Sequence, residues 1–115
     1  MTAKDQREAQ ARQLLARLRA EHEVLKHFRP LDEDEIENAL IQAHPDSPAW
    51  LIRLALHHHL TCDAYLQSLS HGGPRHALDG STHGEVDVDT RHHARNLLKH
   101  HHSHRGSRLK TGKHK

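Results

Sequence analysis

Three consecutive histidines, residues 57–59, stand in the leucine-rich stretch RLALHHHLTCDAYL (residues 53–66), and the whole chain has 16 histidines. Neutral imidazole is a common ligand for zinc, nickel and copper, so a histidine-rich metal-binding protein is one function to consider. Side chains that share a metal from one helix are best placed at i and i+4, whereas consecutive ones project about 100° apart. The spacing therefore indicates no organised metal site, and we expect none.

Nucleophilic chemistry has little support in the sequence. The single cysteine, Cys62, has aspartate and histidine neighbours, but a cysteine at a helix junction is more often a small apolar filler. One cysteine also excludes an internal disulfide and a zinc site of the paired-cysteine type. No glycine-rich phosphate loop precedes an expected helix, and no carboxylate pair stands apart from the capping residues. We expect a protein that is not an enzyme and that needs no cofactor.

Charge is distributed unevenly along the chain, whose net charge is +2. Residues 99–115 hold 6 of the 17 Lys and Arg and no acid, which leaves residues 1–98 with 11 basic and 15 acidic side chains, a net of −4. The tail lacks apolar periodicity, so it predicts a flexible arm that attracts phosphates without sequence preference. A solubilising tail would explain the composition equally well. We place a folded domain at residues 1–98 and a basic, histidine-rich flexible tail at 99–115.

The length of 115 residues suits one small domain. Tryptophan, tyrosine and phenylalanine each occur once, so the core must be built from aliphatic side chains, which favours packed helices. No apolar run approaches the roughly 20 residues of a membrane span, and the N-terminal MTAKDQREAQ lacks the apolar centre of a signal peptide. We expect a cytoplasmic protein with no membrane contact, and the sequence indicates no obligate protein partner.

Two helices are predicted in the first half of the domain. An i, i+3, i+4, i+7 repeat marks the first one, with Ala11, Leu14, Leu15 and Leu18 on its inner face. Asp32 followed by Glu35 has the pattern of a capping box for a short helix that ends before Pro45. Residues 31–48 carry 6 acids and neither Lys nor Arg, so we expect this region to face away from any polyanion. A solvated helix start favoured by the helix dipole explains the same acids.

A buried central helix should follow, starting at Ser47 as the N-cap and Pro48 as the first helical position. Its apolar residues, Trp50 among them, lie on nearly every side. One polar stripe remains, in which Arg53 and His57 lie one turn apart. These two side chains are therefore the ones that this helix can present to a ligand.

The rest of the domain should hold a hairpin and a last helix. Asp79 and Gly80 lie between two short extended runs and predict a β-hairpin, the only sheet that we expect. Asp87 or Asp89 can cap the last helix, whose inner face would carry Ala94, Leu97 and Leu98. The predicted fold class is mostly α with a small β-hairpin (α+β).

Five short motifs occur in an order that resembles the ProQ/FinO family of bacterial RNA chaperones. They are RPL (29–31), LIRLAL (51–56), AYL (64–66), PRHALDGSTHGEVD (74–87) and HHAR (92–95), so that the resemblance runs from about residue 29 to 98. It implies one compact domain whose basic concave face grips the base of an RNA hairpin and its single-stranded 3′ tail. The family's targets are similar to intrinsic terminators, which implies a role with small regulatory RNAs in post-transcriptional regulation, protecting the RNA and promoting RNA–RNA pairing.

Matched motif by motif, the family's RNA-binding residues fall on Arg53, Tyr65, Arg75 and Arg95, and a position where relatives carry a basic residue falls on His57. Arginines can donate paired hydrogen bonds to phosphate, and a tyrosine ring can stack on an unpaired base or bond through its hydroxyl. Two plainer alternatives stay open. Tyr65 could be a core residue with its hydroxyl at the surface, and single arginines on helices are usually solvated.

The chain departs from the family pattern in two places. Asp32 and Glu33 stand where relatives often have a basic residue and a glycine, and Ala49 stands where some have lysine. With an acidic body as well, we expect weaker or more selective RNA binding, with the tail supplying part of the attraction.

Overall fold

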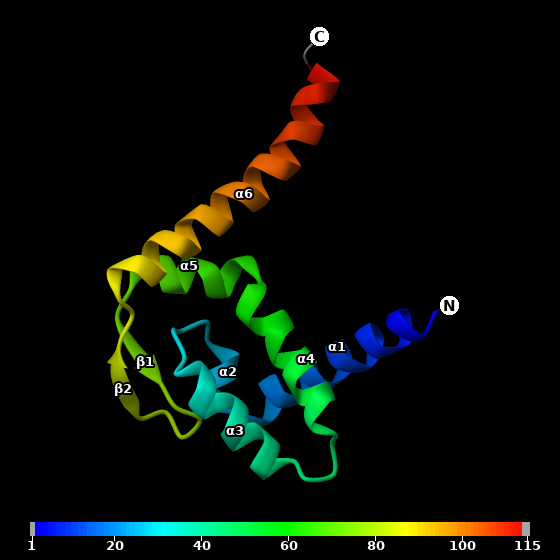
Figure 1. Cartoon of the computed structure of the whole chain (residues 1–115), viewed down its shortest axis with the longest axis vertical. Helices are drawn as coiled ribbons and strands as arrows, with labels where there is room; N and C mark the ends of the chain where they lie inside the picture. Colours follow the sequence, from blue (N-terminus) through cyan, green and yellow to red (C-terminus); the bar gives the residue numbers. More distant parts are fainter. Residues whose placement is uncertain (1, 114–115) are drawn as a thin grey trace.

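The computed structural model describes residues 2–113 of the chain, and their side chains from residue 2 to 101. Helices dominate the described part, and a single hairpin lies at one side of it (Figure 1). The elements are α1 (Ala3–Glu21), α2 (Glu23–Lys26), α3 (Glu33–Ala43), α4 (Ala49–Thr61), α5 (Asp63–His71), β1 (Pro74–His76), β2 (Thr82–Glu85) and α6 (Val88–Lys113). The predicted fold class is confirmed. No helix in the described residues has the length and apolar character needed to cross a bilayer.

Helix α1 packs against α4. The inner face of α1 is the one that the i, i+3, i+4, i+7 repeat predicted. The four side chains concerned are all buried: Ala11, Leu14, Leu15 and Leu18. The helix begins with a true capping box, which we did not predict. Thr2 Oγ1 accepts a hydrogen bond from the Asp5 amide at 3.1 Å, and the Asp5 carboxylate accepts one from the Thr2 amide at 3.3 Å.

The caps of the two middle helices differ from the prediction. Asp32 is the N-cap of α3, but its side chain makes no capping hydrogen bond. Its carboxylate instead lies 3.9 Å from Nδ1 of His83 on β2, so the predicted capping box is wrong. Helix α4 has Pro48 at the N-cap, one residue later than expected from Ser47, and Trp50 in its first turn is 45% exposed because it precedes the part of the helix that enters the core.

The hairpin forms as predicted, with β1 and β2 antiparallel and Pro74 paired with Glu85. In its turn the Asp79 carboxylate accepts bonds from the amide and hydroxyl of Ser81, which lowers the pKa of Asp79. The next residue, Gly80, has a φ of 91°, a conformation that suits glycine. The backbone of His76 bonds to the segment before α3, so the hairpin is docked onto that segment.

Helix α6 starts where one of the two predicted caps lies. The Asp87 carboxylate accepts a hydrogen bond from the Thr90 amide at 2.7 Å, and this bond lowers the pKa of Asp87. Of the predicted inner face, Ala94 and Leu98 are buried. The helix continues without a break past residue 98 to Lys113. Side chains from residue 102 onward lie outside the described ones, so the flexibility of the 99–115 tail stays a prediction.

Candidate functional site

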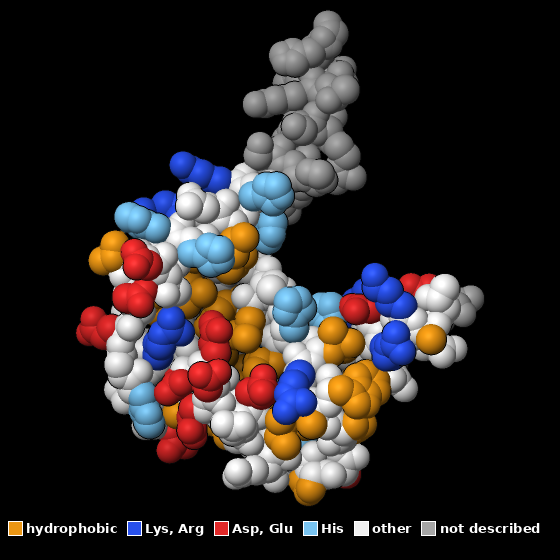
Figure 2. Space-filling model, in the orientation of Figure 1, with side chains coloured by type: hydrophobic (Ala, Val, Ile, Leu, Met, Phe, Trp, Pro, Cys, Tyr) orange, Lys and Arg blue, Asp and Glu red, His pale blue; other side chains and the backbone are white. Residues whose placement is uncertain are grey.

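One stripe of α3 carries two acids that meet three of the predicted site residues. Glu33 and Glu37 are one turn apart on α3. The carboxylate of Glu37 accepts a hydrogen bond from Arg53 Nε at 3.2 Å. That of Glu33 accepts one from the Tyr65 hydroxyl at 2.9 Å and lies 4.0 Å from Arg75 NH1. We expected the acids of residues 31–48 to face away from a polyanion, but these two lie beside three of the predicted RNA-binding residues. Figure 2 shows acidic side chains gathered between Lys and Arg on that face.

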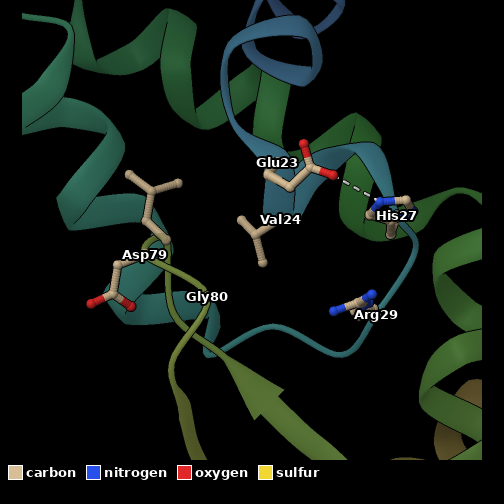
Figure 3. Close-up of a pocket in the computed structure, with 7 residues that line it drawn as sticks. Glu23, Val24, His27, Arg29, Asp79 and Gly80 are labelled. Carbon is tan, nitrogen blue, oxygen red and sulfur yellow. Dashed lines mark hydrogen bonds and ion pairs between the residues drawn. The ribbon is translucent and has the colours of Figure 1, made fainter.

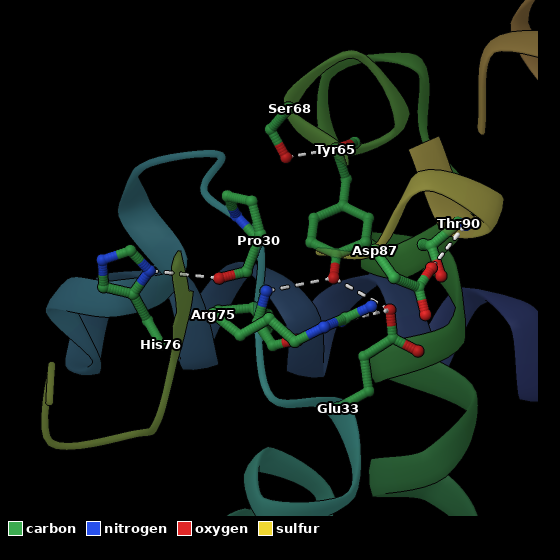
Figure 4. Close-up of polar contacts among 9 residues, drawn as sticks. Pro30, Glu33, Tyr65, Ser68, Arg75, His76, Asp87 and Thr90 are labelled. Carbon is green, nitrogen blue, oxygen red and sulfur yellow. Dashed lines mark hydrogen bonds and ion pairs between the residues drawn. The ribbon is translucent and has the colours of Figure 1, made fainter. Parts of the chain in front are cut away.

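Tyr65 is the centre of a partly buried network (Figure 4). Its ring is fully buried, and its hydroxyl accepts a hydrogen bond from the Leu31 amide at 3.2 Å while donating to Glu33. Burial, followed by the nearby Glu33 charge, raises the pKa of Tyr65. A base cannot stack on this ring in the present conformation. Of the alternatives open from the sequence, the core role fits, and the hydroxyl is bonded within the protein.

Arg75 joins the hairpin to the same network. Its NH1 donates a hydrogen bond to the Leu31 carbonyl at 2.8 Å, and 22% of its side chain is exposed. Three acids, Asp32, Glu33 and Asp34, line the shallow pocket into which Arg75 faces. One guanidinium against three carboxylates makes this corner electrostatically unfavourable for a phosphate unless Arg75 turns outward.

Arg53 and His57 present themselves to solvent as predicted. The Arg53 side chain is 57% exposed, and His57 lies one turn further along α4 and is also exposed. An exposed ion pair such as Arg53 with Glu37 contributes only about 0 to 1 kcal/mol. A phosphate can therefore replace the carboxylate at little cost, which makes this part of α4 available to an anionic ligand.

The other two histidines of the triplet are committed to protein contacts. His58 Nε2 lies 2.7 Å from a carboxylate oxygen of Glu8 on α1. His59 is fully buried, accepts hydrogen bonds at Nδ1 from Arg19 Nε at 3.2 Å and NH2 at 3.1 Å, and stacks on Phe28. Burial, and then the Arg19 charge, lowers the pKa of His59 to about 4. His59 is thus a neutral core residue.

Arg95 lies on a different element from the α3 stripe. It is exposed on α6, and its NH2 is 3.4 Å from the Ser70 carbonyl of α5. The neighbouring Arg91 packs its side chain over Gly72, which has a φ of 80° and could accept a Cβ only if Arg91 moved. The structure therefore groups Arg53, Tyr65 and Arg75 around α3, with His57 one turn from Arg53 on α4, and leaves Arg95 on the α5–α6 surface.

A second shallow pocket lies between α2 and the hairpin turn (Figure 3). Arg29 lies on one side of it, and Glu23 and Asp79 lie on the others. Glu23 holds His27 at 3.0 Å, and this contact lowers the pKa of Glu23. The mixed charges of the lining make it a weaker anion site than the α4 surface.

The acids Glu33 and Glu37 are the site residues that sequence reasoning missed. One sequence feature could have drawn attention to Glu33: it stands where relatives of the resembled family often have a glycine. Its contact with Tyr65 could not be predicted, because the two residues are 32 positions apart.

Comparisons with known proteins agree on one family. The sequence model of the ProQ/FINO family matches residues 9–111. The crystal structure of a FinO-like RNA chaperone from Neisseria meningitidis MC58 superposes with a TM-score of 0.71 at 32% sequence identity, covering 76% of this chain and 93% of that one. Among curated proteins, none matches the chain. The family match begins within α1 and ends within α6, so it covers more of the chain than residues 29–98, where the motifs lie.

Proposed function

The chain belongs to the ProQ/FinO family, and from this premise we propose that it is an RNA chaperone that captures RNA hairpins carrying a single-stranded 3′ end. The family identification made from the motifs is confirmed, and so is the expectation that the chain is not an enzyme. We further propose that binding protects the RNA and promotes its pairing with a second RNA in the bacterial cytoplasm, as part of post-transcriptional regulation.

Arg53, His57, Arg75 and Arg95 are the phosphate-binding residues of the proposed site. An RNA duplex presents mainly its backbone to proteins, so arginines placed on α4, β1 and α6 would recognise the shape of a helix more than its sequence. Tyr65 has a different part in this proposal. Its buried hydroxyl holds the Leu31 backbone, whose carbonyl accepts a bond from Arg75 in the RNA-free protein. Tyr65 thus fixes the segment from which Arg75 turns outward to a phosphate, and it makes no stacking contact.

Glu33 and Glu37 give the proposed site its selectivity. Glu33 lies against Arg75, and Glu37 pairs with Arg53. A phosphate that binds either arginine must therefore displace a carboxylate and approach an acidic stripe. Exchanging the exposed Arg53–Glu37 pair costs little, so the selectivity would come from repulsion between the acidic stripe and each phosphate. A single non-specific phosphate contact gains too little to overcome this repulsion, whereas a rigid duplex end that engages several arginines together gains more. The six Lys and Arg of residues 99–115 would then supply attraction to any RNA.

The likeness to the FinO-like RNA chaperone over 93% of that chain is the observation that carries the proposal. The experiment is a binding titration with a terminator-like hairpin, the same hairpin without its 3′ tail, and a DNA duplex of equal charge. We expect the tailed hairpin to bind tightest. Equal affinity for all three would reject the proposed function.

Arg75→Ala sharpens that titration. It should weaken binding of the tailed hairpin by roughly 1 to 3 kcal/mol, the scale of a charge-assisted hydrogen bond. Arg12→Ala is the matched control, because Arg12 is exposed on α1, outside the proposed site. Circular dichroism separates lost contact from lost fold, and unchanged affinity of a folded Arg75→Ala protein would remove Arg75 from the site.

A further inference from the structure

Two histidines that the proposed function does not use meet where two helices end. His22 is the C-cap of α1 and His44 is the C-cap of α3. Their Nε2 atoms are 2.9 Å apart, and Glu21 Oε1 lies 3.8 Å from Nε2 of His44. The ligand atoms of all three residues lie within 4.8 Å of one another.

We propose that these three residues, the His22–His44 site, bind a divalent ion of the zinc class. The Nε2 atoms of His22 and His44 and one carboxylate oxygen of Glu21 would be the ligands, with water in the remaining position. Two imidazoles and a carboxylate are a donor set that zinc uses in proteins. The site differs from the run of three histidines in sequence, because its ligands come from the ends of separate helices.

The separation of the two ligand nitrogens is close to what zinc requires. Zinc–nitrogen bonds of about 2.0 to 2.1 Å at a tetrahedral angle put two ligand nitrogens about 3.3 Å apart. The observed 2.9 Å separation therefore needs only a small widening. Burial and the nearby His44 lower the pKa of His22, which keeps a neutral, metal-binding imidazole available.

Helix electrostatics favour a cation at this place. The carbonyl groups at a helix C-terminus carry partial negative charge, and His22 and His44 cap the C-termini of α1 and α3. His22 is also the N-cap of α2, but that helix has only four residues, so its positive end offsets only part of this attraction. His44 is 7% exposed, so an ion bound to it would be partly shielded from water. Both features strengthen the attraction beyond what exposed histidines offer.

Arg17 opposes the ion and sets a limit on its affinity. Its Nε lies 3.4 Å from Glu21 Oε2 and its NH2 3.5 Å from His44 Nδ1. Glu21 can keep Arg17 on Oε2 while Oε1 turns to the metal. When Nε2 of His44 binds metal, however, Nδ1 carries the proton and can no longer accept from Arg17. Arg17 must then move, so Arg17→Gln should bind zinc more tightly than the parent.

Histidines elsewhere in the full chain will also bind zinc, so the test measures the consequence of binding in the folded state. An ion held only by the folded protein raises the melting temperature, whereas one bound equally to the folded and unfolded chain does not. The experiment is thermal unfolding of the full chain with zinc chloride, and with magnesium chloride as the control. We expect zinc alone to raise the melting temperature.

Variants assign the ligands. His22→Gln should lower the affinity derived from the zinc-dependent shift by at least roughly tenfold, since losing even an outer-shell partner of a metal costs that much. Glu21→Gln, at an exposed position, tests the same site if His22→Gln folds poorly. His27→Gln is the matched control, because His27 is exposed and contacts Glu23 instead. A parent shift retained in both His22→Gln and Glu21→Gln, or absent from the parent, would overturn the site.

Discussion

The side of α4 that packs on α1 and the side that meets α3 use arginine and histidine in opposite ways. Toward α1, Arg19 donates to the neutral, buried His59, under the ring of Phe28. Toward α3, Arg53 pairs with Glu37 in solvent, and His57 is exposed beside it. The first contact lies within the core, where Nδ1 of His59 is paired and its Nε2 is not, whereas we expect that the second can be exchanged for a phosphate. Surroundings decide which basic side chains can serve RNA.

The two contacts differ in the free energy that is lost when each is broken. The Arg19–His59 contact cannot be given up without leaving a buried polar group unpaired, which costs about 1 to 3 kcal/mol. The exposed Arg53–Glu37 pair can be given up for about 0 to 1 kcal/mol. We therefore expect a phosphate ligand to compete on the α3 side of α4 rather than on the α1 side.

Substitution of the buried histidine should have the largest effect. His59→Ala leaves a cavity and removes the acceptor of Arg19, so the free energy of unfolding should fall by about 2 to 4 kcal/mol in urea titrations. His57→Ala is the matched control on the same helix and should change the unfolding free energy by less than about 0.5 kcal/mol. Equal losses in the two variants would erase the contrast between the sides of α4.

The stability of the protein should also depend on pH through His59. Its folded-state pKa of about 4 lies below the unfolded value of 6.5, so the unfolded chain binds the extra proton between these values. The stabilisation is complete above about pH 6.5 and is lost as pH falls toward 4, by on the order of 1 to 3 kcal/mol.

Urea titrations from pH 7.5 to 4 measure this loss, with His59→Leu as the comparison. The leucine protein should lack this part of the pH dependence. The lowered pKa values of Asp79 and Asp87 act in a lower range, near and below about 3.8. His22, whose pKa is also lowered, acts in the same range as His59 but is present in both proteins, so the difference between parent and variant isolates His59. An identical pH slope in parent and variant would show that His59 is not the group responsible.

Local patterns predicted the elements because they depend on neighbours in sequence. The inner face of α1 and the hairpin turn at Gly80 are set within a few residues, and both were correct. For the last helix, Asp87 or Asp89 was predicted as the cap, and Asp87 is the one that caps it. The exposure of Arg53 and His57 also followed from helix periodicity.

Partners distant in sequence were not predictable in the same way. Arg19 and His59 are 40 residues apart, and Tyr65 and Glu33 are 32 apart. Only tertiary packing places them together, so the burial of His59 and the stabilising, non-stacking position of Tyr65 required the structure. The meeting of His22 with His44, 22 residues away, was missed for the same reason.

Removing the acid on the exchangeable side should strengthen RNA binding. Glu37→Gln frees Arg53 and should improve the affinity for a tailed hairpin by about 0.5 to 1 kcal/mol at physiological salt. Glu35 is exposed on α3, and the Arg53 contact is made by Glu37. Glu35→Gln therefore removes one negative charge but leaves the Arg53–Glu37 pair intact, so it should have a smaller effect. Fluorescence anisotropy titrations compare the two, and equal gains would mean that only the total charge matters.

The smallest expected effect concerns His57. A phosphate near His57 would favour its protonated form, so RNA binding should tighten modestly as pH falls from about 8 to 6. His57→Gln should reduce this dependence, while His58→Gln, whose imidazole contacts Glu8, should retain it. Histidines of the tail contribute equally to all three proteins, so the difference between them isolates His57. A parental pH slope in His57→Gln would make it an ordinary surface residue.

Mapping the RNA on the two sides of α4 tests the central claim most directly. Side-chain NMR signals of the arginines can be followed as a hairpin with a 3′ tail is added to the full chain. We predict that the Nε–H signals of Arg53, Arg75 and Arg95 shift at stoichiometric RNA, while that of Arg19 stays in place. A shift of Arg19 with Arg53 and Arg75 unchanged would contradict it, because the RNA would then bind on the α1 side.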